Sequence, residues 1–230
     1  MLARRWAAIG VVAFVLLAGA LLALHLRHPS DSVAVGTPAE IRERLDHDPR
    51  NPDLWLSLAW AIEIEVGMGI DEQQSQANRT EDPVQRMLRL SSRATEAAPR
   101  RLAEGLAAAD MALRYTGTNA TPRKQGLVWQ QKVRLLMLAG RFLEAAVVAE
   151  TAARDLEDAE GWLAPYQWAT LQTLAVHADL CAGEWEAAEA ALSRLREEVA
   201  ASGSSDEWAE ELDEWQGYLD KRRGDGDGPG

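Results

Sequence analysis

Two stretches of sequence decide the fold of this 230-residue chain: LMLAGRFLEAAVVAETAA at 136–153 and DLCAGEWEAAEAALSRL at 179–195. They align when Gly140 is laid on Gly183, so that each has an Ala-Gly pair after an apolar run and then a segment rich in helix-forming residues. Glycine allows the chain to reverse in a tight turn. Each stretch therefore predicts a hairpin of two helices.

The alignment also superposes side chains suited to hold such a hairpin together. Phe142 falls on Trp185, and Ala145 falls on Ala188. An aromatic ring packs beneath the turn, and small alanines let two helices approach closely. Hairpins that recur in this way stack into a solenoid.

The rest of the chain beyond residue 39 is also helical in pattern. Ala, Leu, Glu, Arg and Trp dominate, and no stretch alternates apolar and polar residues as a half-buried strand would. Prolines and glycines mark where the expected elements begin and end. These are a helix from Pro38 to Asp48, a helix from Pro52 that ends at Gly67 and Gly69, a loop over 70–81, a helix from Pro83, a boundary at Pro99, a helix over 100–115 and a turn from Thr116.

The two hairpins resemble the tetratricopeptide repeat family, whose motif has a Trp, a Gly eleven positions later, an aromatic residue two positions after that Gly and an Ala five positions after it. The matching residues are Trp129, Gly140, Phe142, Ala145 and Ala152 in the first hairpin and Gly183, Trp185 and Ala188 in the second. Residues 48–59, with Trp55 and Leu58, look like a junction between two such repeats. The resemblance implies an α-solenoid of stacked hairpins.

This sequence departs from the family's pattern in two ways. Gly140 and Gly183 are 43 residues apart, whereas the family repeats every 34, which implies longer helices or an extra loop. Lys132 and Val133 stand where the family has Leu and Gly. An irregular helical bundle, which shares the hairpin through general packing rules, is the alternative to a solenoid over 40–222. Residues 223–230, rich in Gly and Asp, predict a disordered tail.

An uncharged apolar run, WAAIGVVAFVLLAGALLALHL, covers 6–26. At about 1.5 Å per residue a helix of this length crosses the roughly 30 Å hydrocarbon core of a bilayer. It predicts a single transmembrane anchor, with Trp6, Phe14 and Leu26 among its membrane-contacting residues. A cleaved secretory signal is the alternative, although this run exceeds the about 7 to 15 apolar residues usual in signals.

Charge beside the apolar run predicts its orientation. Arg4 and Arg5 precede it and Arg27 follows it, which favours a cytoplasmic N-terminus. Residues 1–28 then form a short stub and the anchor, and 29–39, a mixture of Pro, Ser and Gly, form a linker. We expect a single-pass protein of a bacterial-type inner membrane, with its helical domain on the periplasmic side.

The domain beyond the anchor is strongly acidic. After the three arginines near the anchor, the chain carries 21 basic and all 36 acidic residues, a net charge of −15. Such a field repels nucleic acid, and it favours basic partners or simply solubility. The single cysteine, Cys181, excludes an internal disulfide and any multi-cysteine metal centre.

No catalytic motif is present. The chain has no GxxxxGK[ST], GxSxG or HExxH, and no serine or cysteine stands beside a recognisable base. His177 and Cys181 have the spacing of two zinc ligands on one helix, but two ligands do not make a site. We expect no enzyme activity, cofactor or metal. The alternative is an enzyme or cofactor-binding protein with a site scattered over the helices, including His177, Cys181 or Asp46.

The C-terminal segment carries a stripe of large apolar residues. Trp208 and Trp215 are seven residues apart and share a helix face with Leu212 and Leu219. The stripe either caps the solenoid or, as the alternative, binds a helix of a partner. Together these features predict a membrane-anchored, non-catalytic scaffold that binds a protein partner, in the manner of anchored repeat proteins that assemble membrane-associated or periplasmic complexes.

Overall fold

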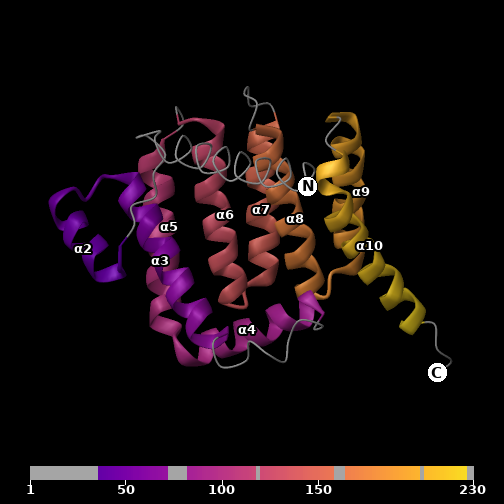
Figure 1. Ribbon diagram of the computed structural model, residues 1–230, viewed down its shortest axis with the longest axis horizontal. Coiled ribbons are helices and arrows are strands. Elements are labelled where there is room, and N and C mark those ends of the chain that lie inside the picture. Colours follow the sequence, from indigo (N-terminus) through magenta and orange to yellow (C-terminus); the bar gives the residue numbers. More distant parts are fainter. Residues whose placement is uncertain (1–35, 72–81, 118–119, 158–163, 203–204, 227–230) are drawn as a thin grey trace, which may run out of the picture. The chain divides into compact units, whose positions relative to one another are not determined.

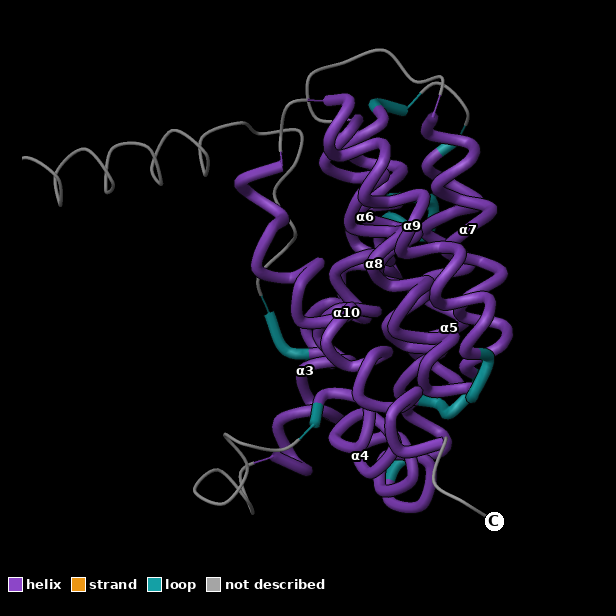
Figure 2. The backbone as a smooth tube through the Cα atoms, turned by 90° about the vertical axis from the view of Figure 1, so that its right-hand side faces the viewer, coloured by secondary structure: helices purple, strands orange, loops and turns teal. Residues whose placement is uncertain are grey.

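The computed structural model confirms the all-α class. It describes residues 36–71, 82–117, 120–157, 164–202 and 205–226. Within these ranges every regular element is a helix, and no strand is present (Figures 1 and 2). The predicted anchor over 6–26, residues 29–35 of the predicted linker and residues 72–81 of the predicted loop lie outside the described residues, and the last two linker residues belong to the first described helix.

Nine helices make up the described chain. They are α2 (Pro38–His47), α3 (Pro52–Asp71), α4 (Pro83–Ala97), α5 (Pro99–Thr116), α6 (Pro122–Leu138), α7 (Phe142–Glu157), α8 (Ala164–Ala182), α9 (Trp185–Ser202) and α10 (Ser205–Gly226). The first five begin with proline, which suits the first turn because proline lacks the N–H that is unpaired there and its φ is already helical. The predicted helix starts at Pro38, Pro52, Pro83 and Pro99 are therefore confirmed.

Two helices run past glycines that the sequence predicts will end them. α3 continues through Gly67 to Asp71, and α10 extends to Gly226, into the segment expected to be a disordered tail. Glycine costs a helix only about 1 kcal/mol relative to alanine, whereas proline costs about 3 kcal/mol. Buried contacts made by Val66, which is 4% exposed, lie in the same turn and favour continuation of α3. The predicted ends at these glycines are wrong for this reason.

The helices stack in pairs, an arrangement consistent with an α-solenoid. α3 packs on α5, α6 on α7 and α8 on α9, and each pair packs on the next through α5 with α6 and α7 with α8. We call α3, α6 and α8 the inner row, because α3 contacts α6 and α6 contacts α8. α5, α7 and α9 form the outer row, whose described residues make no close backbone contact between one helix and another.

The turns α6–α7 and α8–α9 have the same geometry. Gly140 and Gly183 have positive φ values of 70° and 82°. At each turn the glycine N–H donates to a carbonyl three residues back, and the next N–H donates to one five residues back, at 2.9 to 3.2 Å. This is the Schellman motif, which satisfies the last carbonyls of a helix and needs a left-handed residue. The predicted hairpins at these glycines are therefore present.

A second glycine permits a close approach inside the inner row. A Cβ atom on Gly126 of α6 would lie 2.6 Å from Gln167 Oε1 of α8, too close for any side chain. One turn later Gln130 Nε2 donates a hydrogen bond of 2.5 Å to the same Gln167 oxygen, in a buried position. The pair satisfies polar groups that would be costly to bury alone, and it fixes the register of α6 against α8.

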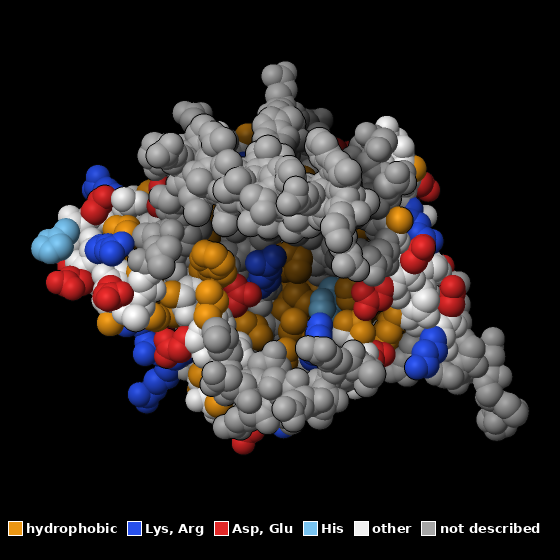
Figure 3. Space-filling model, in the orientation of Figure 1, with side chains coloured by type: hydrophobic (Ala, Val, Ile, Leu, Met, Phe, Trp, Pro, Cys, Tyr) orange, Lys and Arg blue, Asp and Glu red, His pale blue; other side chains and the backbone are white. Residues whose placement is uncertain are grey.

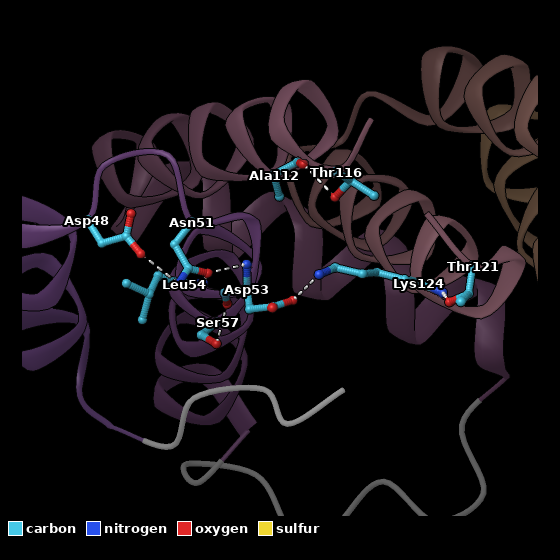
Figure 4. A network of polar contacts seen from close by, with 9 residues as sticks. All are labelled: Asp48, Asn51, Asp53, Leu54, Ser57, Ala112, Thr116, Thr121 and Lys124. Carbon is cyan, nitrogen blue, oxygen red and sulfur yellow. Dashed lines mark hydrogen bonds and ion pairs between the residues drawn. The ribbon is translucent and has the colours of Figure 1, made fainter. Parts of the chain in front are cut away.

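The start of the stack is tied by a polar network (Figure 4). Asn51 Oδ1 caps α3 by accepting from the N–H groups of Asp53 and Leu54, and Asn51 Nδ2 donates to Asp48. Lys124 Nζ lies 2.7 Å from Asp53 Oδ1 and joins the N-termini of α3 and α6. Because both N-termini meet at this pair, α3 and α6 run in the same direction, as neighbouring inner helices of a solenoid must.

Helix α4 departs from this regular pairing. It is inserted between α3 and α5, and it contacts α3, α5, α6 and α8, lying across one end of the upright helices in Figure 1. Val84, which is 1% exposed, anchors it in the core formed by α8, α9 and α10. The insertion places α4 directly after α3, the helix that carries Trp55 and Leu58, so that α3 pairs with α5 rather than with the next helix in sequence.

Helix α10 ends the stack by packing on α9. Trp208 and Trp215 are only 8% and 5% exposed, and with Leu212 and Leu219 they belong to the same core as Leu192 of α9. This burial is what a capping helix needs, because it covers the apolar face of the last hairpin. The alternative role for these tryptophans is contact with a partner. Little ring surface is available for such contact, because both rings are already covered by the chain's own helices.

Candidate binding groove

A largely apolar groove of about 430 Å³ lies on the inner row. The lining residues are Trp60, Glu63, Ile64 and Gly67 of α3, Met87 and Leu90 of α4, Arg134, Met137 and Leu138 of α6, and Leu174 and His177 of α8. Figure 3 shows hydrophobic side chains gathered near the middle of this face, with charged side chains and a histidine among them. We call this feature the inner groove.

Two residues of α3 expose the groove's apolar surface. Trp60 is 42% exposed and Ile64 is 43% exposed, and four-residue spacing places them on one side of the helix. Leu58 and Ile62, on other sides of α3, are buried in the core. Helix α3 is thus apolar around much of its circumference, which is more than packing on one neighbouring layer requires. Exposed apolar surface of this kind makes the groove a candidate binding site for a ligand or partner.

A carboxyl group interrupts this apolar lining. Glu63 Oε2 accepts a hydrogen bond of 2.8 Å from Gln131 Nε2. Burial raises the pKa of Glu63, while the Gln131 hydrogen bond and nearby Arg134 act in the opposite direction. Within the described chain no Lys or Arg forms a salt bridge with Glu63. The groove therefore holds an acidic group whose charge is offset by Arg134 at longer range but by no salt bridge within the described chain.

His177 is the groove's second titratable group. Burial lowers its pKa to about 4, although a hydrogen bond with the backbone of Pro83 favours the charged form. Since proline has no N–H, the imidazole donates to the carbonyl; its Nε2 atom is buried without a partner in the described chain. The ring centroid lies 4.8 Å from that of Trp215. The geometry fits a neutral packed imidazole at the groove wall.

Of the residues proposed for a scattered catalytic or metal site, the fold places His177 and Cys181 on one helix and Asp46 on another that does not pack against it. Cys181 lies one turn from His177 on α8, and burial raises the pKa of its thiol to about 12, so it is not a reactive thiolate. Asp46 belongs to α2, which packs on α3 and forms the Arg42–Glu104 salt bridge with α5. No cluster of three or more His, Cys, Asp or Glu residues in the described ranges is placed to hold a metal ion.

The residues predicted to pack the repeats lie outside the groove. Leu58, Ala145 and Ala188 are buried in helix–helix contacts, and Trp55, Trp129, Phe142 and Trp185 are half-buried against the same cores. The groove residues Trp60 and Ile64 were missed. The run WLSLAWAIEIEV could have indicated them, because its apolar residues lie on all sides of the helix rather than on one buried stripe.

Comparison of the chain with protein-family models, with curated proteins and with solved structures found no match to any of them. Within the described residues, no helix combines the length and apolar character needed to cross a membrane. The predicted anchor, with Trp6, Phe14 and Leu26, falls outside those residues.

Proposed function

We propose that this chain is a membrane-anchored, non-catalytic adaptor. Residues 6–26 hold it in the bilayer, and the domain at 40–222, a tetratricopeptide-like α-solenoid, binds a protein partner during assembly of a membrane-associated or periplasmic complex. The inner groove is the observation that carries the proposal. Its exposed Trp60 and Ile64 offer the partly buried aromatic and aliphatic surface on which protein contacts concentrate their free energy.

The charge of the groove and of the domain supports a basic partner. Glu63 forms no salt bridge within the described chain, although Arg134 acts on it at longer range, and the chain beyond the anchor has a net charge of −15. A bound segment that places apolar side chains on Trp60 and Ile64 and one Lys or Arg beside Glu63 would complete this ion pair. The wider acidic field speeds the encounter with such a basic segment.

A photo-crosslinking amino acid at position 64 of the full chain tests this proposal in native membranes washed with alkaline carbonate. Retention of the chain in the washed membrane is the result expected of an anchored protein. After irradiation, mass spectrometry should recover one partner whose cross-linked peptide combines apolar residues with Lys or Arg. Glu63→Gln should lower the yield of this adduct roughly fivefold, the effect of losing about 1 kcal/mol from a partly exposed ion pair.

The matched control places the same cross-linker at Val147 of α7, which is 62% exposed and lies outside the groove. The adduct should be absent there. Cross-linking to a second copy of this chain, equal adducts at both positions, or a peptide without a basic residue would each contradict the proposal. Release of the chain by carbonate would contradict the anchoring part of the proposal.

A further inference from the structure

A second cleft lies on the opposite side of α8, between α7 and α9, and we call it the outer cleft. Its volume is about 140 Å³, enough for the end of one side chain and too small for a helix. Glu150, Glu157, Glu197 and Glu198 line it together with Arg154 and Arg194. Trp168 and Gln172 of α8 line it as well.

Negative charge exceeds positive charge in this cleft. Arg194 Nη2 is paired with Glu150 Oε1 at 3.1 Å. The remaining Glu157, Glu197 and Glu198 form no salt bridge within the described chain, and Arg154 is the only other basic group of the lining. A cation entering the cleft would therefore meet a surplus of carboxylates at short range.

A buried acceptor lies among these charged residues. Gln172 is 9% exposed, and its Oε1 atom has no hydrogen-bond donor in the described chain. An unpaired buried acceptor is costly unless a ligand or water supplies a donor. Trp168 adds an indole ring at the same site, and aromatic faces attract ammonium and guanidinium groups. Acceptor, aromatic ring and carboxylates are the groups that bind an organic cation.

Asp179 gives independent evidence for an excess of negative charge near the outer cleft. It lies seven residues after Gln172 on the same side of α8, is 5% exposed, and its Oδ2 atom also lacks a donor in the described chain. Burial raises its pKa to about 6, with Glu150 and Glu184 acting in the same direction and Arg194 against it. Negative charge in this part of the domain is thus compensated incompletely.

We propose that the outer cleft binds the ammonium group of an organic cation. Gln172 Oε1 accepts a hydrogen bond from the ammonium, Trp168 packs against the adjoining alkyl chain, and Glu197 and Glu198 neutralise the charge. The ammonium can belong to a free polyamine or to a lysine side chain of another protein, since both present the same group on a flexible alkyl chain.

Isothermal titration calorimetry of the full chain in non-ionic detergent tests the site with two probes, spermidine and an acetylated Lys-Ala-Lys peptide amide. One-to-one binding that weakens with added salt is expected. Tighter binding of spermidine identifies a free polyamine as the source of the cation, and tighter binding of the peptide identifies a protein. Mg²⁺ at the same concentration should not displace either probe, because it cannot use the indole or the alkyl contacts.

Two variants, E197Q/E198Q and Q172L, locate the binding, and a third, E43Q/E96Q, is the control. E197Q/E198Q should weaken the preferred probe roughly tenfold through loss of two nearby charges. E43Q/E96Q makes the same charge change at exposed positions of α2 and α4 and should have little effect. Q172L should also abolish binding without loss of folding stability, because it removes an acceptor that is unpaired in the described chain. Unsaturable heats, displacement by Mg²⁺, or equal losses in E197Q/E198Q and E43Q/E96Q would overturn the proposal.

Discussion

The inner groove and the outer cleft share α8 but differ in chemistry. On the inner side, Leu174 and His177 contribute to an apolar wall. On the outer side, Trp168 and Gln172 are surrounded by carboxylates. Burial on α8 disfavours the charged form of a titratable group on each side: the pKa of His177 falls to about 4, and that of Asp179, seven residues beyond Gln172, rises to about 6. A helix in the middle of a stack can thus serve two surfaces with opposite electrostatic character.

The largest expected effect on stability comes from a substitution in the buried part of α8, between the inner groove and the outer cleft. Leu171 of α8 is fully buried in the core shared by α6, α7 and α8. Leu171→Ala should lower the free energy of unfolding by about 3 kcal/mol, the usual cost of a buried leucine cavity. Urea denaturation of the full chain, followed by circular dichroism, measures this. The matched control, Leu143→Ala at a 58% exposed position of α7, should cost under about 0.5 kcal/mol. Equal effects would contradict the assignment of α8 as the central helix.

The second prediction concerns the acidic side. The pKa of Asp179 is raised from 3.8 to about 6, so the folded chain binds this proton more tightly than the unfolded chain. Its contribution to stability therefore declines as the pH rises from about 4 to 6 and stays unfavourable above 6. Asp179→Asn removes that penalty and should stabilise the domain by about 2 kcal/mol at pH 8 and hardly at all at pH 4.

Urea titrations at both pH values measure the Asp179 effect. Glu184→Gln, at an exposed neighbour of Asp179, provides the control and should change stability only slightly through a weaker effect on the Asp179 pKa. A loss of stability in Asp179→Asn at pH 8 would show that the carboxylate has a favourable partner, and the contrast between the two sides of α8 would fail.

The third and smallest prediction concerns the apolar side. Because burial lowers the pKa of His177 from 6.5 to about 4, the unfolded chain binds this proton more tightly, and stability falls as the pH decreases through that range. In wild type the Asp179 effect opposes this loss between pH 6 and 4. In an Asp179→Asn background the loss should appear clearly, with roughly 1 kcal/mol gone at pH 5.5 relative to pH 8.

Adding His177→Gln to that background should remove the acid-induced loss. Urea midpoints measured in steps from pH 8 to pH 4.5 provide the comparison. If the pH profile is unchanged by His177→Gln, another group controls the acid sensitivity of the inner side, and the neutral imidazole is not its cause.

Local chemistry made much of the fold predictable. Proline at the first helical position and glycine with positive φ at a helix end act within a few residues, so the starts at Pro38, Pro52 and Pro83 and the turns at Gly140 and Gly183 follow from the sequence. The predicted end of α3 at Gly67 and Gly69 and the predicted tail from residue 223 were wrong, because a single glycine weakens a helix without breaking it, and packing then decides.

The binding surfaces were much less predictable. Trp60 and Trp55 are both tryptophans of α3, yet the first lines the groove and the second packs on the core. Gln172 and Gln131 are both buried glutamines, but Gln131 donates to Glu63 whereas the Oε1 of Gln172 lacks a donor in the described chain. Such differences depend on neighbours from distant parts of the sequence, which periodicity does not specify.

The sequence by itself determined that the domain is helical, where most of its helices begin, and that two hairpins turn at equivalent glycines, since these features depend on backbone preferences and on contacts within a few residues. Only the tertiary structure decided that α4 lies across the inner row, that Trp208 and Trp215 are buried, and that the two sides of α8 carry different chemistry. Those outcomes depend on which helices meet, and that is set by packing among segments far apart in the chain.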